Sequence, residues 1–262
     1  MSRTADSPAA RPAAAPLRDG VVLALLAFAV GRLLAQDTFY GPDGRMLIKM
    51  TMSGLVAHPL HWFAPQFLRA SHAAIAWTGG SWYEAGLLLS QVGFAFAAFA
   101  WHRAAAVLGV PRGRAAVVVA LCATAPAILF FTSVVELHAP FLAFAAGACW
   151  AAARLATRPT PGAGVLFGVV TGVALGAHAT AHLLVPWLLI FAWLRAPRGA
   201  ARFLPWLGAV AAHVAVSVAL PVALRAAGAA IEAGGAGSYL LFEARGRRLL
   251  AALPAQTWTD WL

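Results

Sequence analysis

The stretch DTFYGPDGRMLIKMTMSGLVAHPLH, residues 37–61, decides how the rest of the chain is interpreted. It follows the first long apolar run and carries two of the chain's nine acidic residues, Asp37 and Asp43. Its Gly-Pro-Asp-Gly segment is typical of a turn. Its His-Pro-Leu-His segment adds His58 and His61. We therefore expect a long polar loop here, and the rest of the fold depends on which other polar residues reach it.

The composition around this loop is that of a membrane protein. Hydrophobic residues make up 61% of the chain and charged residues 11%, whereas a soluble domain carries about 25% charged residues. The net charge of +10 comes mostly from arginines in short connections between apolar runs. That distribution indicates membrane topology rather than a nucleic-acid partner. We expect an all-α, multi-pass transmembrane helical bundle.

Apolar runs near the length of about 20 residues that a bilayer requires predict about seven spans. They are placed at about residues 20–36, 83–101, 115–131, 137–155, 164–177, 183–194 and 203–224. Pro126 predicts a kink in the third span. Residues 58–78 mix aromatic side chains with Arg69 and His72, which is typical of an amphipathic helix in the membrane interface.

The same pattern divides the chain into three parts. Residues 1–18 are expected to form a disordered cytoplasmic tail, and residues 19–225 the transmembrane domain. Residues 226–262 are expected to form an amphipathic segment on the outer face, which leads to a further C-terminal part.

Charged residues separate onto two sides when the spans are numbered. Arginines fall before the first span and between spans two and three, four and five, and six and seven, a side that the positive-inside rule makes cytoplasmic. The other side receives Asp37, Asp43, Glu84, Glu136, His138, His178 and His182. We therefore expect a multi-pass protein of the cell membrane with a cytoplasmic N-terminus.

The polar residues of the outer side are candidates for chemistry. Asp37 and Asp43 are each suited to act as a general base or to bind a cation, although Asp43 also fits a plain turn position. Glu136 and His138 share a tight connection, where Glu136 also fits the role of an interfacial cap. His178 and His182 are four residues apart, which on a helix would put them on one face and suit a metal ion.

Three segments carry a family resemblance. They are DGRMLIKMTMSGLVAHPLHWF after the first span, VVELHAPFLAFAAGACWAAARL, and FGVVTGVALGAHATAHLLVPWLLIFAWLR. Together they resemble the GT-C superfamily of polytopic glycosyltransferases, and most closely its protein O-mannosyltransferase-like bacterial branch. The resemblance covers roughly residues 20–202.

The resemblance implies transfer of a sugar from a polyprenyl-phosphate carrier to an acceptor glycan, lipid or protein on the outer face, with inversion at the sugar carbon. It assigns the catalytic base to Asp43, with Asp37 second. It assigns binding of the carrier phosphate or the substrate to His58, Glu136, His138, His178 and His182. A divalent cation between phosphate and carboxylate is compatible with this arrangement. Two other interpretations stay open: a non-catalytic or truncated membrane subunit, and a multi-pass transporter.

Overall fold

The computed structural model of the chain describes residues 14–37, 42–52, 61–136, 138–178, 180–197 and 203–226. Within these ranges every regular element is a helix. The all-α class predicted from the sequence is therefore confirmed.

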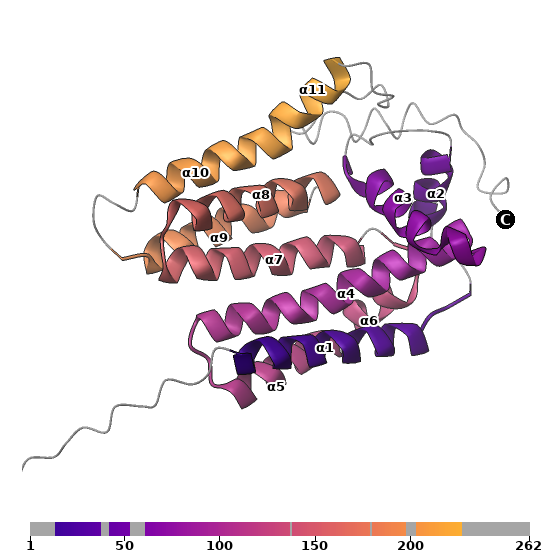
Figure 1. The fold of residues 1–262 in the computed structure, drawn as a ribbon, viewed down its shortest axis with the longest axis horizontal. Coiled ribbons are helices and arrows are strands. Elements are labelled where there is room, and N and C mark those ends of the chain that lie inside the picture. The colour runs from indigo at the N-terminus through magenta and orange to yellow at the C-terminus, as the bar shows by residue number, and fades with distance from the viewer. Residues whose placement is uncertain are drawn as a thin grey trace, which may run out of the picture.

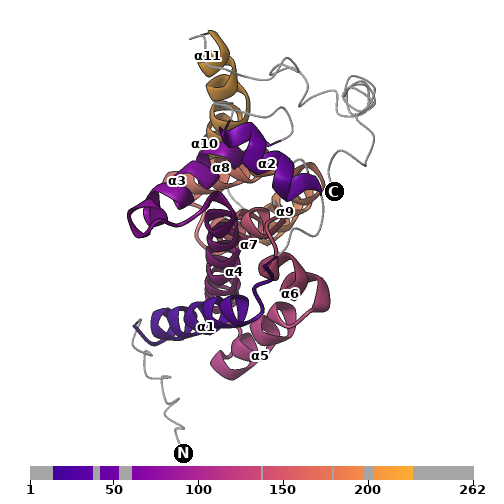
Figure 2. The same cartoon turned by 90° about the vertical axis from the view of Figure 1, so that its right-hand side faces the viewer.

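Most of the helices lie side by side along one direction. They are α1 (Ala14–Leu33), α2 (Pro42–Met52), α3 (Ala64–Ile75) with the 3₁₀ turn η1 (Ala76–Thr78), α4 (Trp82–Val107), α5 (Arg112–Ala123), α6 (Pro126–Ser133), α7 (His138–Thr157), α8 (Pro161–Ala177), α9 (Ala181–Arg195), α10 (Phe203–Val214), the π-helical turn η3 (Ala215–Ala219) and α11 (Leu220–Ala226). In Figure 1 α4 and α7 occupy the middle, with α1 packed on α4 and α8 on α7. The short helices α2 and α3 lie at one end of the long ones (Figures 1 and 2).

Length and composition support a membrane location. Within the described ranges, three helical segments are long and apolar enough to cross a bilayer: Trp82–Val107, His138–Thr157 and Phe203–Ala223. A fourth is obtained if α5 and α6, which are bent by 64° at a short break, count as one span. The helices α8 and α9 are apolar but shorter. Three or four spans are fewer than the seven that the sequence predicts, so the seven-span topology stays a prediction.

The break between α5 and α6 confirms the kink predicted at Pro126. Helix α5 ends at Ala123 and α6 begins at Pro126. Proline has no N–H to give to the preceding turn, and its ring clashes with the carbonyl four residues back, so a helix ends or bends before it. At the first position of a new helix the missing N–H costs nothing.

The predicted turn after the first span is wrong. Residues 42–44 form the first turn of α2 rather than a β-turn. The sequence permits this, because proline is favoured at the first helical position and an acidic residue is favoured in the first turn. Gly44 also packs on the carbonyl of Val135, where a Cβ would overlap the backbone. The predicted loop of residues 37–61 therefore contains a helix that lies against the α6–α7 connection.

Two other boundaries differ from the sequence analysis. Helix α1 begins at Ala14, so its first turn includes residues that were assigned to the disordered tail; residues 1–13 lie outside the described ranges. Of the expected amphipathic helix at 58–78, the structure describes α3 and η1, and residues 58–60 are again outside.

Helix α4 starts with a signal that the sequence shows clearly. Ser81 and Glu84 form a capping box: the Glu84 N–H donates to the Ser81 hydroxyl at 3.2 Å, and the Ser81 N–H donates to the Glu84 carboxylate at 2.6 Å. This pair satisfies two backbone donors that a helix start otherwise leaves without partners. Gly79, with φ of 78°, makes the left-handed turn that ends η1.

The chain reverses direction from helix to helix, so its connections lie alternately at the two ends of the bundle. The candidate residues and most of the arginines thereby lie at opposite ends. One end of the bundle holds the end of α1, the starts of α4, α7 and α9, and the ends of α6 and α8 (Figure 1). The described candidate residues at this end are Asp37, Glu84, Glu136, His138, His178 and His182. The other end holds Arg18, Arg103, Arg112, Arg158 and Arg195. We call the first the polar end and the second the arginine end.

Candidate functional site

The connection between α6 and α7 is held in place by hydrogen bonds from α4 and from a residue that follows α1. The Ser90 hydroxyl, from α4, donates to the Val134 carbonyl at 2.9 Å. The Gln36 N–H, just after α1, donates to the Ser133 carbonyl at 2.9 Å. These bonds satisfy polar groups that burial would otherwise leave unpaired. They also fix the backbone two residues before Glu136, which is 8% exposed.

Three imidazole rings gather beside Glu136. The His138 Nδ1 lies 3.1 Å from the Glu136 Oε2. The ring of His178 lies 4.9 Å from that of His138 and 4.8 Å from that of His61, measured between centroids. We call Glu136, His61, His138 and His178 the histidine cluster. It joins the start of α7, the end of α8 and the segment just before α3.

Aromatic side chains form an apolar wall next to these rings. Phe131 stacks on His138 at 4.4 Å, and Phe141 lies 5.3 Å from His178, between ring centroids. An apolar wall lowers the local dielectric constant, which strengthens the electrostatic interactions and hydrogen bonds between the groups beside it.

Hydrogen-bond partners assign the tautomer of each ring. His61 Nδ1 lies 3.0 Å from the Ala177 carbonyl, which can only accept, so this nitrogen carries its proton. His138 Nδ1 donates in the same way to Glu136. Both contacts therefore place a proton on Nδ1.

His178 has the opposite tautomer. Its Nδ1 accepts from the Thr180 N–H at 3.1 Å, so the ring proton is on Nε2. Burial, and next the neighbouring rings of His61 and His138, lower the pKa of His178 to about 4, while Glu136 acts in the other direction. At neutral pH His178 is thus an uncharged ring whose Nε2–H can donate a hydrogen bond.

Asp43 belongs to helix α2, whose first turn lies close to the histidine cluster. It is the second residue of α2, and the adjacent Gly44 packs directly on the Val135 carbonyl, one residue before Glu136. The start of α2 therefore lies against the segment that carries Glu136. The side chain of Asp43 is outside the described part of the structure, and so is the whole of His58.

Asp37 occupies a different setting. It follows the end of α1 at a bend and is exposed. The neighbouring Gln36 carbonyl accepts a hydrogen bond from the Tyr83 hydroxyl at 2.8 Å. The structure therefore places Asp37 over the start of α4, at the surface of the polar end.

The expected pairing of His178 with His182 on one helical face is wrong. His178 follows the end of α8 with an extended backbone, φ −158° and ψ 133°, and α9 begins only at Ala181. His178 belongs to the histidine cluster, whereas His182 lines a separate cavity of about 200 Å³. Among the described residues there is no group of three or more His, Cys, Asp or Glu side chains placed to hold a metal ion.

Two histidines gain importance from the structure. His61 was expected at the outer side without an assigned role, and it proves to be part of the cluster. His213, in α10, lines the cavity with His182 and was not anticipated. The one signal for it in the sequence is an ionisable side chain within an apolar run, which is by itself a reason to suspect function.

Comparison of the chain with protein-family models, with curated proteins and with solved structures found no match.

Proposed function

We propose that this chain is a membrane glycosyltransferase of GT-C-like architecture, which moves a sugar from a polyprenyl-phosphate carrier to an acceptor hydroxyl at the polar end of the bundle. The observation that supports it is the histidine cluster beside the first turn of α2. Segments far apart in the chain, around residues 43, 61, 136 and 178, come to one place there. Elsewhere the chain is mostly apolar.

The proposed topology counts each apolar helix as a span. The spans are α1, α4, the bent pair α5–α6, α7, α8, α9 and the continuous segment from α10 to α11. An odd number of spans puts the chain's two ends on opposite sides. The arginine end then faces the cytoplasm under the positive-inside rule, and the polar end faces outward in the cell membrane.

In the proposed reaction Asp43 accepts the proton of the acceptor hydroxyl. The acceptor oxygen forms a bond to the sugar carbon from one side while the bond from that carbon to the carrier phosphate breaks on the other, so the configuration inverts. The Nε2–H of His178 donates to a phosphate oxygen. Glu136 orients His138 through its Nδ1–H, which holds that ring toward the same group.

The proposal makes different demands on the two aspartates. Asp43→Asn is nearly isosteric but cannot take up a proton, and loss of a general base typically costs about 10²–10⁴-fold in rate. Asp37→Asn is the matched control, because Asp37 is exposed at the same end of the bundle. We expect this variant to lose much less of the transfer rate.

The test uses the full chain in liposomes with a set of polyprenyl-phosphate sugars and acceptors, and measures sugar transfer. Transfer by the wild type that survives in Asp37→Asn and is lost in Asp43→Asn supports the proposal. Full activity of Asp43→Asn would remove Asp43 as the base and make Glu136 the next candidate. If no donor and acceptor pair supports transfer by the wild type, the transferase assignment fails and a non-catalytic membrane subunit takes its place.

A further inference from the structure

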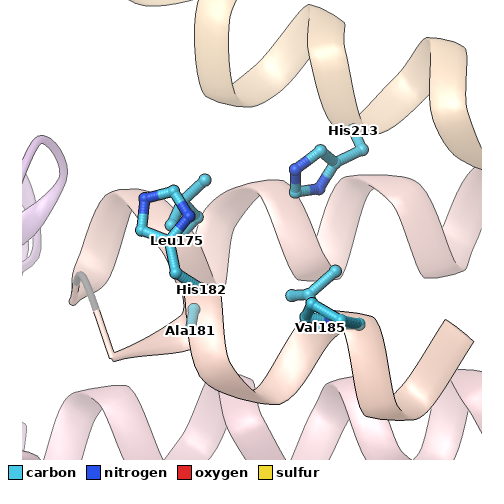
Figure 3. A pocket seen from close by; sticks show the side chains of 6 residues that line it. Leu175, Ala181, His182, Val185 and His213 are labelled. Carbon is cyan, nitrogen blue, oxygen red and sulfur yellow. The ribbon is translucent and has the colours of Figure 1, made fainter. Parts of the chain in front are cut away.

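A second polar feature lies apart from the histidine cluster, in a cavity of about 200 Å³ between α8, α9 and α10. Its lining is Leu175, Ala181, His182, Val185, Pro186 and His213. Figure 3 shows the rings of His182 and His213 on opposite sides of this space, one from α9 and the other from α10. These are the two polar side chains of the lining, so the occupant has to suit both.

His213 lies half-way along an apolar span, the segment Phe203–Ala223, which is long enough to cross a bilayer. Its side chain is half-buried, and its backbone packs on α8, since a Cβ built on Gly172 would lie 3.2 Å from its carbonyl oxygen. Ionisable side chains at this depth are costly, and they face the interior of a bundle or a water-filled cavity. The cavity beside His213 is therefore a candidate for water.

Both imidazoles offer hydrogen bonds in every protonation state. The Nδ1 of His213 lies 3.0 Å from the Thr171 hydroxyl oxygen, and its Nε2 is a second donor or acceptor whose role depends on the tautomer. A neutral ring of His182 likewise has one N–H and one lone pair. Water both donates and accepts, so it fits each combination of tautomers, whereas an acyl chain offers these nitrogens nothing.

Two other kinds of occupant match the lining less well. No Lys or Arg is among the six lining residues, so an anion would have no positive charge opposite it. A protein zinc site uses three or four side-chain ligands, and this lining has two imidazoles and no carboxylate or thiolate. With about 30 Å³ for each molecule in the liquid, the cavity has room for several waters.

The cavity connects the middle of the span with the polar end. His182 is the second residue of α9, which starts at the polar end, and its side chain is exposed. In the direction of the arginine end α8 and α10 close together, because a Cβ built on Gly168 would overlap the Ala209 carbonyl. Water therefore has a path to His213 from the polar end, whereas close packing shuts the space between α8 and α10 toward the arginine end.

We propose that water fills this cavity from the polar end and reaches the imidazole of His213 in the middle of the span, so that His213 exchanges its ring proton with the aqueous phase of that side alone. The site does not depend on the transferase assignment, because it uses the span Phe203–Ala223 and none of the residues of the histidine cluster.

The test places single cysteines in the full chain without Cys122 and Cys149, and measures their rate of reaction with a small, charged, membrane-impermeant methanethiosulfonate. The thiolate is the reactive form and needs water around it, so we expect His213→Cys to react about tenfold faster than Val210→Cys or Val214→Cys. The two valines are the matched controls: they flank His213 on α10 and are 56% and 47% exposed, so lipid covers them in a bilayer. Exposure alone would give the opposite order, because His213 is half-buried.

Reference cysteines fix the side of entry. In intact cells and in inside-out vesicles we expect His213→Cys to react from the same side as Glu84→Cys, at the polar end, and not from the side of Arg158→Cys. Filling the cavity with Val185→Phe from α9, or separately with Leu175→Trp from α8, is expected to slow the reaction of His213→Cys about tenfold, since displaced water leaves less thiolate. The same filling variants leave the reaction of Glu84→Cys unchanged, which shows that the fold is kept.

Proton exchange is measured by nuclear magnetic resonance of the full chain in nanodiscs. The ring N–H signal of His213, identified by its loss in His213→Phe, is expected to exchange with water faster in the wild type than in Val185→Phe. The proposal is overturned if these two exchange rates are equal, or if His213→Cys reacts no faster than the two valine controls. Reaction from the side of Arg158→Cys, or an unchanged rate in both filling variants, would overturn it as well.

Discussion

The contact between α8 and α10 provides the sharpest test of the packing. Gly168 faces α10 very closely. A Cβ built on it overlaps the Ala209 carbonyl oxygen, and it lies 2.8 Å from the Ala212 Cβ and 2.9 Å from the backbone nitrogen of His213. Two of these three atoms belong to the backbone and cannot rotate away. Gly168→Ala therefore forces α10 to move outward from α8.

Two opposing terms set the magnitude of this change. Replacing glycine by alanine within a helix gains up to about 1 kcal/mol, whereas an extra group in a close-packed site costs about 1–3 kcal/mol. Because the contacts are to backbone, the cost falls in the upper part of that range, and we expect a net loss of about 1–2 kcal/mol. At Gly162, in the same helix, a Cβ meets nothing within 4 Å, so Gly162→Ala is neutral or stabilising.

The assay is thermal unfolding in one detergent, followed by the loss of helical circular dichroism. One kcal/mol shifts the Tm of a chain of this size by about 2–4 °C, so Gly168→Ala is expected to unfold about 2–8 °C below the wild type. Gly162→Ala is expected at or above the wild type. The reasoning is refuted if Gly168→Ala is as stable as Gly162→Ala, because the helices would then not approach as closely as described.

Two more predictions concern protonation and sidedness. The pKa of His178 is about 4 in the folded chain, whereas an unfolded histidine titrates near 6.5. As pH falls from about 6.5 to 4 the unfolded chain binds the proton first, which favours unfolding. We expect the wild type to lose about 1–2 kcal/mol of stability over this range, after allowance for solvent screening. His178→Asn, measured by Tm across this range, loses less, and parallel pH profiles would contradict the assignment. Single cysteines at position 84 but not at position 158, in a chain without its two natural cysteines, are expected to react with an impermeant thiol reagent on intact cells, and labelling at 158 would reverse the proposed orientation.

Much of the helical framework could be read from local signals in the sequence. The helices α4, α7, α8 and α9 lie within a few residues of the predicted spans, because apolar runs and their polar ends mark helices directly. The capping box at Ser81 and the break before Pro126 are equally local. The placement of Asp37, Glu84, Glu136, His138 and His178 at one end also followed, since it depends only on the alternation of direction.

What could not be read from the sequence depends on contacts between distant segments. The turn predicted at residues 42–44 is a helix, and the signal that distinguishes them is partly the packing of Gly44 on Val135. The spacing of His178 and His182 suggested one helical face, but the chain leaves the helix at His178 and places the two rings in different sites. Neither the tautomer of His178 nor the position of His213 beside a cavity is visible before the fold brings their neighbours together.

The unequal lengths of the helices have a consequence for the surrounding lipid. At a rise of about 1.5 Å per residue, α8 with 17 residues is about 26 Å long and α9 with 15 residues about 22 Å, whereas α4 with 26 residues is about 39 Å. In the proposed topology the hydrocarbon layer of about 30 Å has to thin beside α8 and α9, which costs fractions of a kcal/mol per Å. Headgroups are thereby drawn down toward the short helices, on the side of the bundle where His178 and His182 lie, and the protein is expected to favour membranes built from shorter chains.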